Sequence, residues 1–395
     1  MANWSKKKVE ECFTFIKNGA NIRQEKNAGG VPITRIETLS GGVFNRDRLG
    51  YANIETTEKY SSYILESGDL LFSHINSKAY IGRTVLYEKE GNEVIIHGMN
   101  LLRLKVNPSI VFPKFIYYSF QSESFRNQIA SYRKDAVNQS SISVSDLKKV
   151  EIPVPSLADQ QRIVAELDLL SGIVEKKNAQ LRTLERLAES LFIETFGNLI
   201  ANDRNWRMGT LNEFIEDKKR ILRATKFYKP NEVVHYIDIS SIDNKAHSMT
   251  STTEFVFNEA PSRAQQIVQN GDVLVSMVRP NLRNVAIVSS EDKNLVASSG
   301  FCVLRSLSSN GEFLKQLVLS DFFTDYLLTR VSGANYPAVR EEDIKECKLG
   351  IPPAELQLEF SNKIKALETE RLTIDSSLKT TQNLLASRMD KYFSA

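Results

Sequence analysis

The sequence lacks the features of disulfide-bonded, zinc-binding, membrane and secreted proteins. It has only three cysteines, Cys12, Cys302 and Cys347, with no CxxC pair and no Cys/His cluster. We therefore expect reduced, mostly buried thiols rather than a disulfide framework or a zinc site. No apolar run approaches the length of a membrane span. The start, "MANWSKKKVEECF", has no apolar segment after its basic residues, so it is not a secretory signal. Together these absences predict a cytoplasmic protein.

Signatures of catalysis are missing as well. There is no GxxxxGK[ST] phosphate loop and no GxGxxG after a predicted strand. The "PP" of "GIPPAEL" lacks the preceding acid or asparagine and the following aromatic residue of an amino-methyltransferase site. The four histidines, His74, His97, His235 and His247, have no ligand or catalytic spacing. The sequence therefore predicts a binding protein with no catalytic residue, metal site or cofactor site of its own.

Length and charge leave several binding functions open. The 395 residues, 42 % hydrophobic and 25 % charged, are typical of a globular protein with two or more domains. A net charge of +3 neither demands nor excludes nucleic acid, because binding needs only a local basic surface. Residues 218–230, "KKRILRATKFYKP", are basic and contain no acid. This segment is either a solvated charge run or a surface that contacts phosphates.

The sequence is an internal duplication. The segments "NQSSISVSDLKKVEIPVPSLADQ" (138–160) and "NYPAVREEDIKECKLGIPPAELQ" (335–357) share an asparagine, an aspartate, a lysine, a proline and a glutamine at one offset of 197 residues. Both tryptophans follow an asparagine, and "SGDLLFS" (67–73) matches "NGDVLVS" (270–276). Gly-Asp before a β-rich run predicts a turn that leads into a strand. The interval that follows each strand differs between the halves, as specificity-carrying loops do.

Each half ends in a heptad pattern that predicts a long helix. Apolar residues recur at steps of four and three from Ala158 to Phe196, interrupted by Lys177, and again from Glu355 to Phe393, interrupted by Arg371 and Thr381. Each helix would span roughly 60 Å. Such a helix needs a packed face, so we expect the two to pair. Lys177 and Arg371 would either fix the register of the pair or extend their charges to water at its edge.

The ordered duplication resembles one family, the DNA-specificity subunit of type I restriction–modification systems. The resemblance covers nearly the whole chain. It rests on "NW" at the start of each half, "GDLLFS" and "GDVLVS", the repeated segments that begin "NQSSISVSDLKK" and "NYPAVREEDIKE", the long helices, and the junction "FGNLIANDRNW". The second copy lacks the Gln-Gln-Arg-Ile of "DQQRIV", which bears on whether both helix starts dock a partner equally well.

The resemblance implies an α+β fold with two globular target-recognition domains in tandem, at residues 1–155 and 198–352. It implies that residues 156–197 and 353–395 are spacer helices that pair as an antiparallel coiled coil. Each domain would read one half of a split, asymmetric target in double-stranded DNA. The implied partners are two copies of a modification subunit, which binds S-adenosylmethionine and methylates adenine, and further restriction subunits. This chain would be the non-catalytic DNA-binding subunit of that bacterial defence system.

Candidate DNA contacts follow the two Gly-Asp strands, surround the repeated asparagines or lie in the basic segment 218–230. Arginine pairs with guanine edges, and asparagine or glutamine pairs with adenine edges, so polar loop residues of these types are the candidates. In the first half they are His74, Asn76, Lys78, Tyr80, Arg83, Arg133, Lys134, Asn138 and Gln139. In the second half they are Arg220, Arg223, Lys226, Arg279, Asn281, Arg283, Arg330, Asn335, Tyr336 and Arg340. The alternative for each is that it is an ordinary exposed polar loop residue without a DNA contact.

Two further expectations concern the Gly-Asp pairs and the arginines that follow the second pair. We interpret Gly68-Asp69 and Gly271-Asp272 as turn structure and not as part of a site. No acid lies within six positions of Arg279 or Arg283, so we expect no local ion pair there.

One alternative of a different class stays open. The chain could be a coiled-coil scaffold that joins two protein-binding domains and touches no DNA. A salt-dependent DNA-binding assay with the modification partner separates the two functions. An autonomous methyltransferase is disfavoured by the missing motifs.

Overall fold

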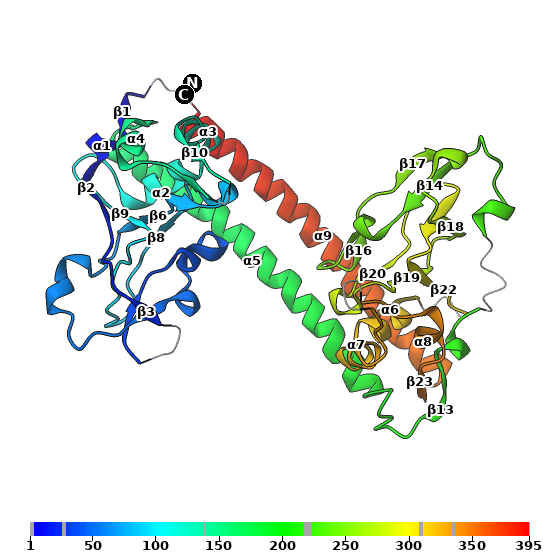
Figure 1. Cartoon of the computed structure of the whole chain (residues 1–395). Helices are drawn as coiled ribbons and strands as arrows, with labels where there is room; N and C mark the ends of the chain where they lie inside the picture. The colour runs from blue at the N-terminus through cyan, green and yellow to red at the C-terminus, as the bar shows by residue number, and fades with distance from the viewer. Residues whose placement is uncertain are drawn as a thin grey trace. The chain divides into compact units, whose positions relative to one another are not determined.

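The chain folds into two compact units. The computed structural model describes residues 4–25, 29–137, 139–216, 223–307, 311–333 and 337–394. Unit 1 comprises Met1–Lys177 and Ser377–Ala395, and unit 2 comprises Asn178–Ser376. Each unit therefore combines one globular part with a portion of both long helices, α5 and α9, as Figure 1 shows.

The two predicted long helices are confirmed. Helix α5 spans Leu157–Phe196 and α9 spans Ala354–Phe393. In unit 1, the start of α5 shares a hydrophobic core with the end of α9, including Tyr392 and Phe393. In unit 2, the end of α5 packs on the start of α9, where the Phe192 and Phe360 rings are 5.5 Å apart. Because each unit joins the start of one helix to the end of the other, the helices pair antiparallel.

The two charged residues that interrupt the heptads, Lys177 and Arg371, have partners. The Lys177 ammonium donates to Ser377 Oγ of α9 at 2.8 Å. The Arg371 guanidinium contacts Glu368 at 2.6 Å, and this hydrogen bond, assisted by the nearby charges of Asp375 and Glu185, raises its pKa. The Lys177 contact joins α5 to α9 and favours the register-fixing interpretation for this residue, whereas the Arg371 contact lies within α9 and does not bear on register.

Unit 1 is built on a four-stranded antiparallel sheet of order β2-β9-β6-β8. Strand β6, Leu70–Phe72, is buried on both faces: Leu70 and Phe72 join the core under the helices, while Leu71 joins a second cluster. This follows from the alternation of side chains along a strand. The other strands of the sheet are β2 (Phe13–Asn18), β9 (Leu102–Val106) and β8 (Thr84–Leu86).

Short helices and small sheets complete unit 1. Its helices are α1 (Val9–Cys12), α2 (Pro113–Gln121), α3 (Glu123–Tyr132) and α4 (Val144–Lys149), with 3-10 turns η1 (Ile36–Gly42), η2 (Arg46–Arg48), η3 (Glu58–Tyr63) and η4 (Lys78–Tyr80). The small sheets pair β1 (Lys6–Lys8) with β12 (Glu151–Pro153), and β5 (Gly50–Ala52) with β3 (Gln24–Glu25) and β4 (Val31–Ile33).

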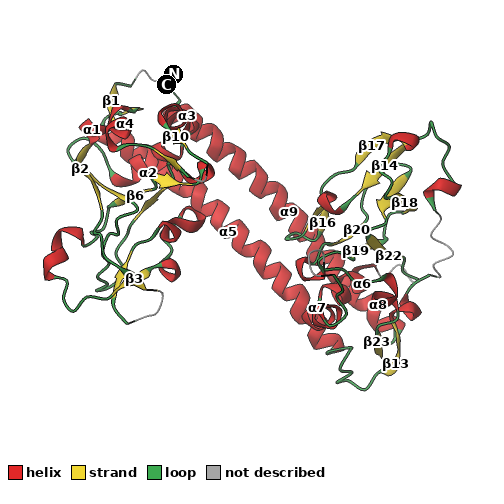
Figure 2. Cartoon of the chain, viewed as in Figure 1, coloured by secondary structure: helices red, strands yellow, loops and turns green. Residues whose placement is uncertain are grey.

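Unit 2 repeats the central part of this frame. Strand β19, Val273–Ser276, alternates in the same way: Val273 and Val275 face the core that contains the helices, and Leu274 faces another cluster. It pairs with β20 (Val285–Ile287) and β22 (Phe301–Leu304). The helices are α6 (Gly311–Leu319), α7 (Asp321–Leu328) and α8 (Glu341–Lys345). Figure 2 shows the mixture of helices and strands in both units, which confirms the predicted α+β class.

The remaining strands of unit 2 extend this frame. A four-stranded sheet of order β17-β14-β21-β18 has no counterpart of that size in the small sheets of unit 1 described above. Its strands are β14 (Val233–Ile237), β17 (Thr253–Val256), β18 (Ala264–Ile267) and β21 (Leu295–Ser298). The pairs are β13 (Arg207–Thr210) with β23 (Lys348–Ile351), and β15 (Ile242–Asp243) with β16 (Ser248–Met249); the 3-10 turns are η5 (Leu211–Phe214), η7 (Ala224–Lys226), η8 (Ile239–Ser241), η9 (Phe257–Glu259) and η10 (Pro280–Leu282).

Two simple predictions can be checked directly. Cys12, Cys302 and Cys347 are free and buried, as expected. Within the described ranges, no helix combines the length and the apolar character needed to cross a membrane.

Candidate nucleic-acid interface

The repeated Gly-Asp pairs form the same turn in both units, with both aspartates buried. Gly68 and Gly271 both have φ of +91°, a left-handed conformation that glycine adopts without strain. Asp69 accepts the Glu66 backbone N–H at 2.7 Å and pairs with Arg103 at 2.7 Å. Asp272 likewise accepts from Gln269 and pairs with Arg305 at 2.7 Å. These residues hold the turn before the central strand, as predicted.

Sequence reasoning missed both arginine partners. Arg103 lies in the apolar run "LLRLKV" and Arg305 in "CVLRSL". An arginine within a buried strand, as Arg103 is, or directly after one, as Arg305 is, is unusual unless it is paired, so this context was the signal that could have found them.

The repeated proline and glutamine form an anchor at the start of each long helix. Gln160 Nε2 donates to Pro155 O at 3.0 Å, and Gln357 Nε2 donates to Pro352 O at 2.8 Å. Both glutamines are buried. These shared prolines and glutamines are therefore part of the scaffold.

In unit 1, two distant candidate segments meet in one place. Strand β7 (Ile75–Asn76) pairs with β11 (Ser140–Ser141), which pairs in turn with β10 (Lys134–Asp135). We call residues 74–83 together with 133–137 and 139–141 the unit 1 loop surface. Most of the first-half candidates lie on it, and Lys78, Tyr80, Lys134 and Gln139 are exposed.

Asp135 is the centre of the charged groups on this surface. Its carboxylate accepts from Arg133 Nε at 2.7 Å and from Ser140 Oγ at 2.6 Å, and Lys78 Nζ is 3.7 Å away. The hydrogen bonds from Arg133 and Ser140 lower the pKa of Asp135 below its ordinary value. The carboxylate stays ionised at neutral pH and holds Arg133 and Lys78 beside each other.

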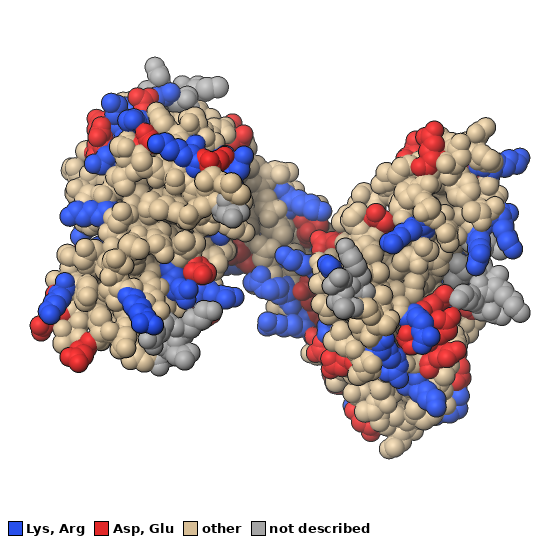
Figure 3. Space-filling model, viewed as in Figure 1, with Lys and Arg blue, Asp and Glu red and all other residues tan. Residues whose placement is uncertain are grey.

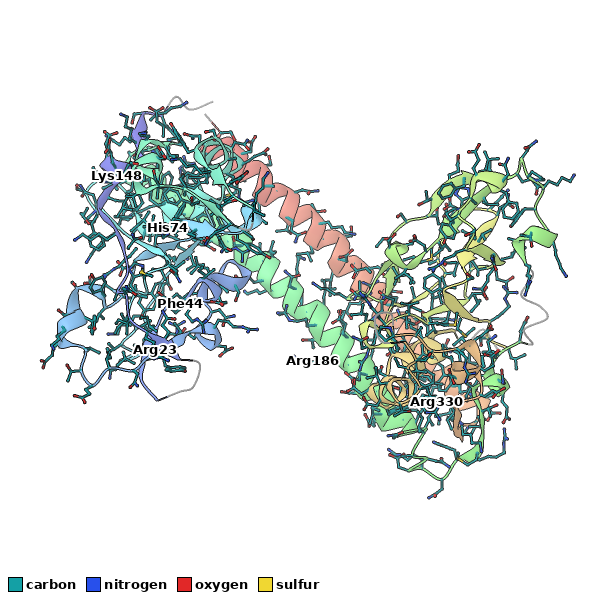
Figure 4. All side chains as sticks on the ribbon, viewed as in Figure 1. Arg23, Phe44, His74, Lys148, Arg186 and Arg330 are labelled. Carbon is teal, nitrogen blue, oxygen red and sulfur yellow. The ribbon has the colours of Figure 1, made fainter. Side chains whose placement is uncertain are left out.

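Three other candidates of unit 1 are more constrained. The Arg83 guanidinium lies 4.3 Å from the centre of the Tyr80 ring, a cation–π contact. The Asn76 side chain donates to Ser73 Oγ at 3.1 Å, so part of its amide is already used. His74 is buried within the β region of unit 1 (Figure 4), and burial lowers its pKa, so the ring is neutral at pH 7.

Unit 2 brings its equivalent segments together in the same way. Val278 forms a β-bridge with Ala338, and the Arg279 backbone N–H donates to Pro337 O at 2.8 Å. Arg279 and Arg283 flank η10 with φ of +51° and +49°. Left-handed backbone is uncommon for residues other than glycine and is concentrated at functional sites. Arg279 and Asn281 are exposed.

The structure supplies an ion pair that the local sequence did not show. Arg283 pairs with Asp321 at the start of α7, 38 positions along the chain, so this arginine is ion-paired although no local acid claims it. Arg330, at the end of α7 (Figure 4), stacks over Tyr326 at 3.7 Å. Arg340 is largely exposed, with its Nε 3.5 Å from Asp343.

The basic segment lies partly apart from these loops. Arg223 forms a β-bridge with Gln266 of β18, in the larger sheet of unit 2, and Lys226 is exposed on η7. The candidates Asn138, Arg220, Asn335 and Tyr336 lie outside the described residues. On the face drawn in Figure 3, basic and acidic side chains are interspersed over both units.

Comparison with known proteins now decides the family. Residues 1–186 and 203–381 match the type I restriction modification DNA specificity domain. The chain belongs to this family. The match has two segments, in agreement with the internal duplication.

Named specificity subunits are similar to the whole chain or to about half of it. A type I restriction enzyme MjaX specificity subunit from Methanocaldococcus jannaschii is 28 % identical over 97 % of this chain and 92 % of its own length. The EcoKI specificity subunit of Escherichia coli is 26 % identical over 52 % of this chain and 44 % of its own length. The S subunit structure from M. genitalium has a TM-score of 0.59, with 14 % identity over 99 % of this chain and 96 % of that one, and shares the fold.

Proposed function

We propose that this chain reads a split DNA target, one half with each unit, and directs a modification enzyme to it. The observation that carries the proposal is the repeated meeting of two candidate segments beside the central strand of each unit, in a chain of the specificity family. The described aspartates and glutamines that the two halves share, Asp69, Asp272, Gln160 and Gln357, are buried and hydrogen-bonded, whereas several loop candidates, Lys78, Tyr80, Lys134, Gln139, Arg279 and Asn281, are exposed.

The chemistry of these loops suits DNA. Exposed lysines and arginines neutralise phosphates and supply a salt-dependent affinity that is independent of sequence. Amide and guanidinium groups read base edges, which supplies specificity. Two reading units in one chain make the second contact intramolecular, so two modest interactions combine into a strong one.

Partners complete the function. Specificity subunits work with methyltransferase and restriction subunits in type I systems. For this chain we propose two copies of the modification subunit, because a duplicated frame presents equivalent surfaces to two identical partners. We propose that S-adenosylmethionine and the methylation chemistry belong to that partner, and that restriction subunits add to the same core.

The test is a binding measurement on a target defined by methylation mapping. The chain is co-expressed with its modification subunit, and methylated adenines in the host DNA define the target. Binding of the purified complex is then measured on the target and on duplexes with the first, the second or both half-sites scrambled, at several salt concentrations.

We expect the intact target to bind about 1,000-fold more tightly than the fully scrambled duplex, with an intermediate loss for each single scramble. Equal affinity for all four duplexes would refute sequence-specific recognition. DNA binding absent at every salt concentration would favour the protein-binding scaffold instead.

A further inference from the structure

One residue of the unit 1 loop surface stands out by its exposure. Val137 is 98 % exposed, the highest value among the exposed large hydrophobic residues of the described chain. It lies at the tip of the hairpin between β10 and β11. The Ala136 backbone N–H donates to Gln139 O at 2.9 Å, which extends the pairing of the two strands.

Neither the turn nor the core of the unit explains a valine here. Tight turns favour glycine, proline, asparagine, aspartate and serine, each for a specific backbone or hydrogen-bonding reason. A β-branched apolar residue offers none of these. A side chain so exposed also gains nothing from packing within the unit. Departures from local sequence preferences are expected at functional sites, so Val137 points to a contact outside the chain.

The base of the hairpin is held firmly enough to aim its tip. Asp135 binds Arg133 and Ser140 by hydrogen bonds and lies near Lys78, and β11 pairs with β7 on its other side. The Lys78 side chain, 71 % exposed, therefore lies beside the hairpin base, where it can meet a phosphate, whereas Arg133 is held by Asp135. A two-stranded ribbon fits the width of the major groove of DNA.

Resting on the function proposed above, we propose that Val137 is a specificity-determining residue that contacts the 5-methyl group of a thymine in the first half-site. In the major groove, this methyl group is the apolar feature that marks a thymine, and small apolar side chains recognise it. A charged or polar tip would lack this contact.

The test removes the methyl group and the valine separately. Each thymine of the first half-site is replaced in turn by deoxyuridine, which lacks only that methyl group. Binding of the complex with the modification subunit is measured for the natural chain, Val137→Ser and Val137→Ile. We expect one position where deoxyuridine weakens binding about fourfold in the natural chain, the value of one buried methyl-sized group.

The two Val137 variants should then differ in their sensitivity to deoxyuridine. Val137→Ile should keep the sensitivity to deoxyuridine, and Val137→Ser should bind both duplexes equally and as weakly as the natural chain binds the deoxyuridine duplex. Val43→Ser is the matched control, because Val43 is also exposed, at 57 %, but lies on another loop of unit 1. It should leave the sensitivity unchanged.

The outcomes distinguish this inference from the proposed function. If target and scrambled DNA bind equally, the proposed function fails and the inference fails with it. If the target is recognised, the inference is overturned by the absence of a methyl-sensitive thymine in the first half-site or by unchanged sensitivity in Val137→Ser. Unchanged DNA binding but weaker association with the modification subunit in Val137→Ser would assign the tip to a protein contact.

Discussion

Replacing Phe393 by alanine should loosen unit 1 and leave unit 2 intact. Phe393 is 1 % exposed, and its ring centre is 5.3 Å from that of Phe115 in α2. It belongs to the core that contains the start of α5 and the central sheet of unit 1. Removing a buried phenylalanine from a core costs about 3–5 kcal/mol through lost contacts and the cavity left behind.

This loss is large compared with the stability of a single domain, about 5–15 kcal/mol. For a unit of this size, each kcal/mol lowers the melting temperature by about 2–4 °C, so we expect the transition of unit 1 to fall by about 6–20 °C. Hydrogen exchange followed by peptide mass spectrometry assigns the change to a unit, because faster exchange should appear in the sheet of unit 1 and not in unit 2.

Two control variants sharpen the test. Phe196→Ala removes the residue that ends the other long helix and that packs against Phe313 and Phe360 in unit 2, so it should give the opposite pattern. Leu384→Ala changes an exposed residue of α9 and should alter neither unit by much. If Phe393→Ala accelerated exchange equally in both units, or in neither, the end of α9 would not be part of the core of unit 1.

Four further predictions follow from the structure. Exchange of residues 1–155 for the matching segment of a relative should change one half of the methylated target only; a change in both halves, read by methylome sequencing, would show that the units do not read independently. Deletion of four residues within 180–188 should disrupt assembly or alter the spacing between half-sites, because it shifts the heptad register; unchanged assembly and spacing would make the helix a loose tether. At least one of Arg279→Ala and Arg283→Ala should cost about 1–3 kcal/mol of binding and relax one base position, or lower the salt slope by about one unit; no effect in either variant would sink the assignment. Burial lowers the pKa of His97 to about 3, so between that value and about 6.5 the unfolded state binds one more proton than the folded state. The stability of unit 1 should therefore fall as the pH drops through this window, by up to about 1.4 kcal/mol per pH unit. His97→Gln should flatten this pH dependence in acid-unfolding curves.

The sequence was a good guide wherever local pattern determines structure. The heptads place both long helices to within a few residues, and the Gly-Asp pairs predict the turn before each central strand. These features depend on neighbours in the chain, through helix periodicity and the left-handed conformation of glycine.

Contacts between distant segments could not be predicted in the same way. The pairing of β7 with β11, which assembles the unit 1 loop surface, joins residues about 65 positions apart and follows from sheet register. The ion pair of Arg283 with Asp321 depends on where α7 lies beside η10. Neither leaves a periodic trace in the sequence, because each depends on how whole elements pack.

The placement of residues 377–395 in the core of unit 1 has a consequence for biosynthesis. Unit 2 is a continuous stretch of chain, so all of its residues leave the ribosome together. Unit 1 is complete only after the roughly 200 residues between its two pieces have been translated, which takes roughly 10–40 s at ordinary elongation rates. During that time, the core position that Phe393 later fills is open, although residues 1–177 have already been made. Unit 2 can therefore fold before unit 1 is complete. In that interval, unit 1 of a nascent chain can accept the end of α9 from a neighbouring copy. Chains on polysomes are therefore the place to look for dimers that have exchanged this helix.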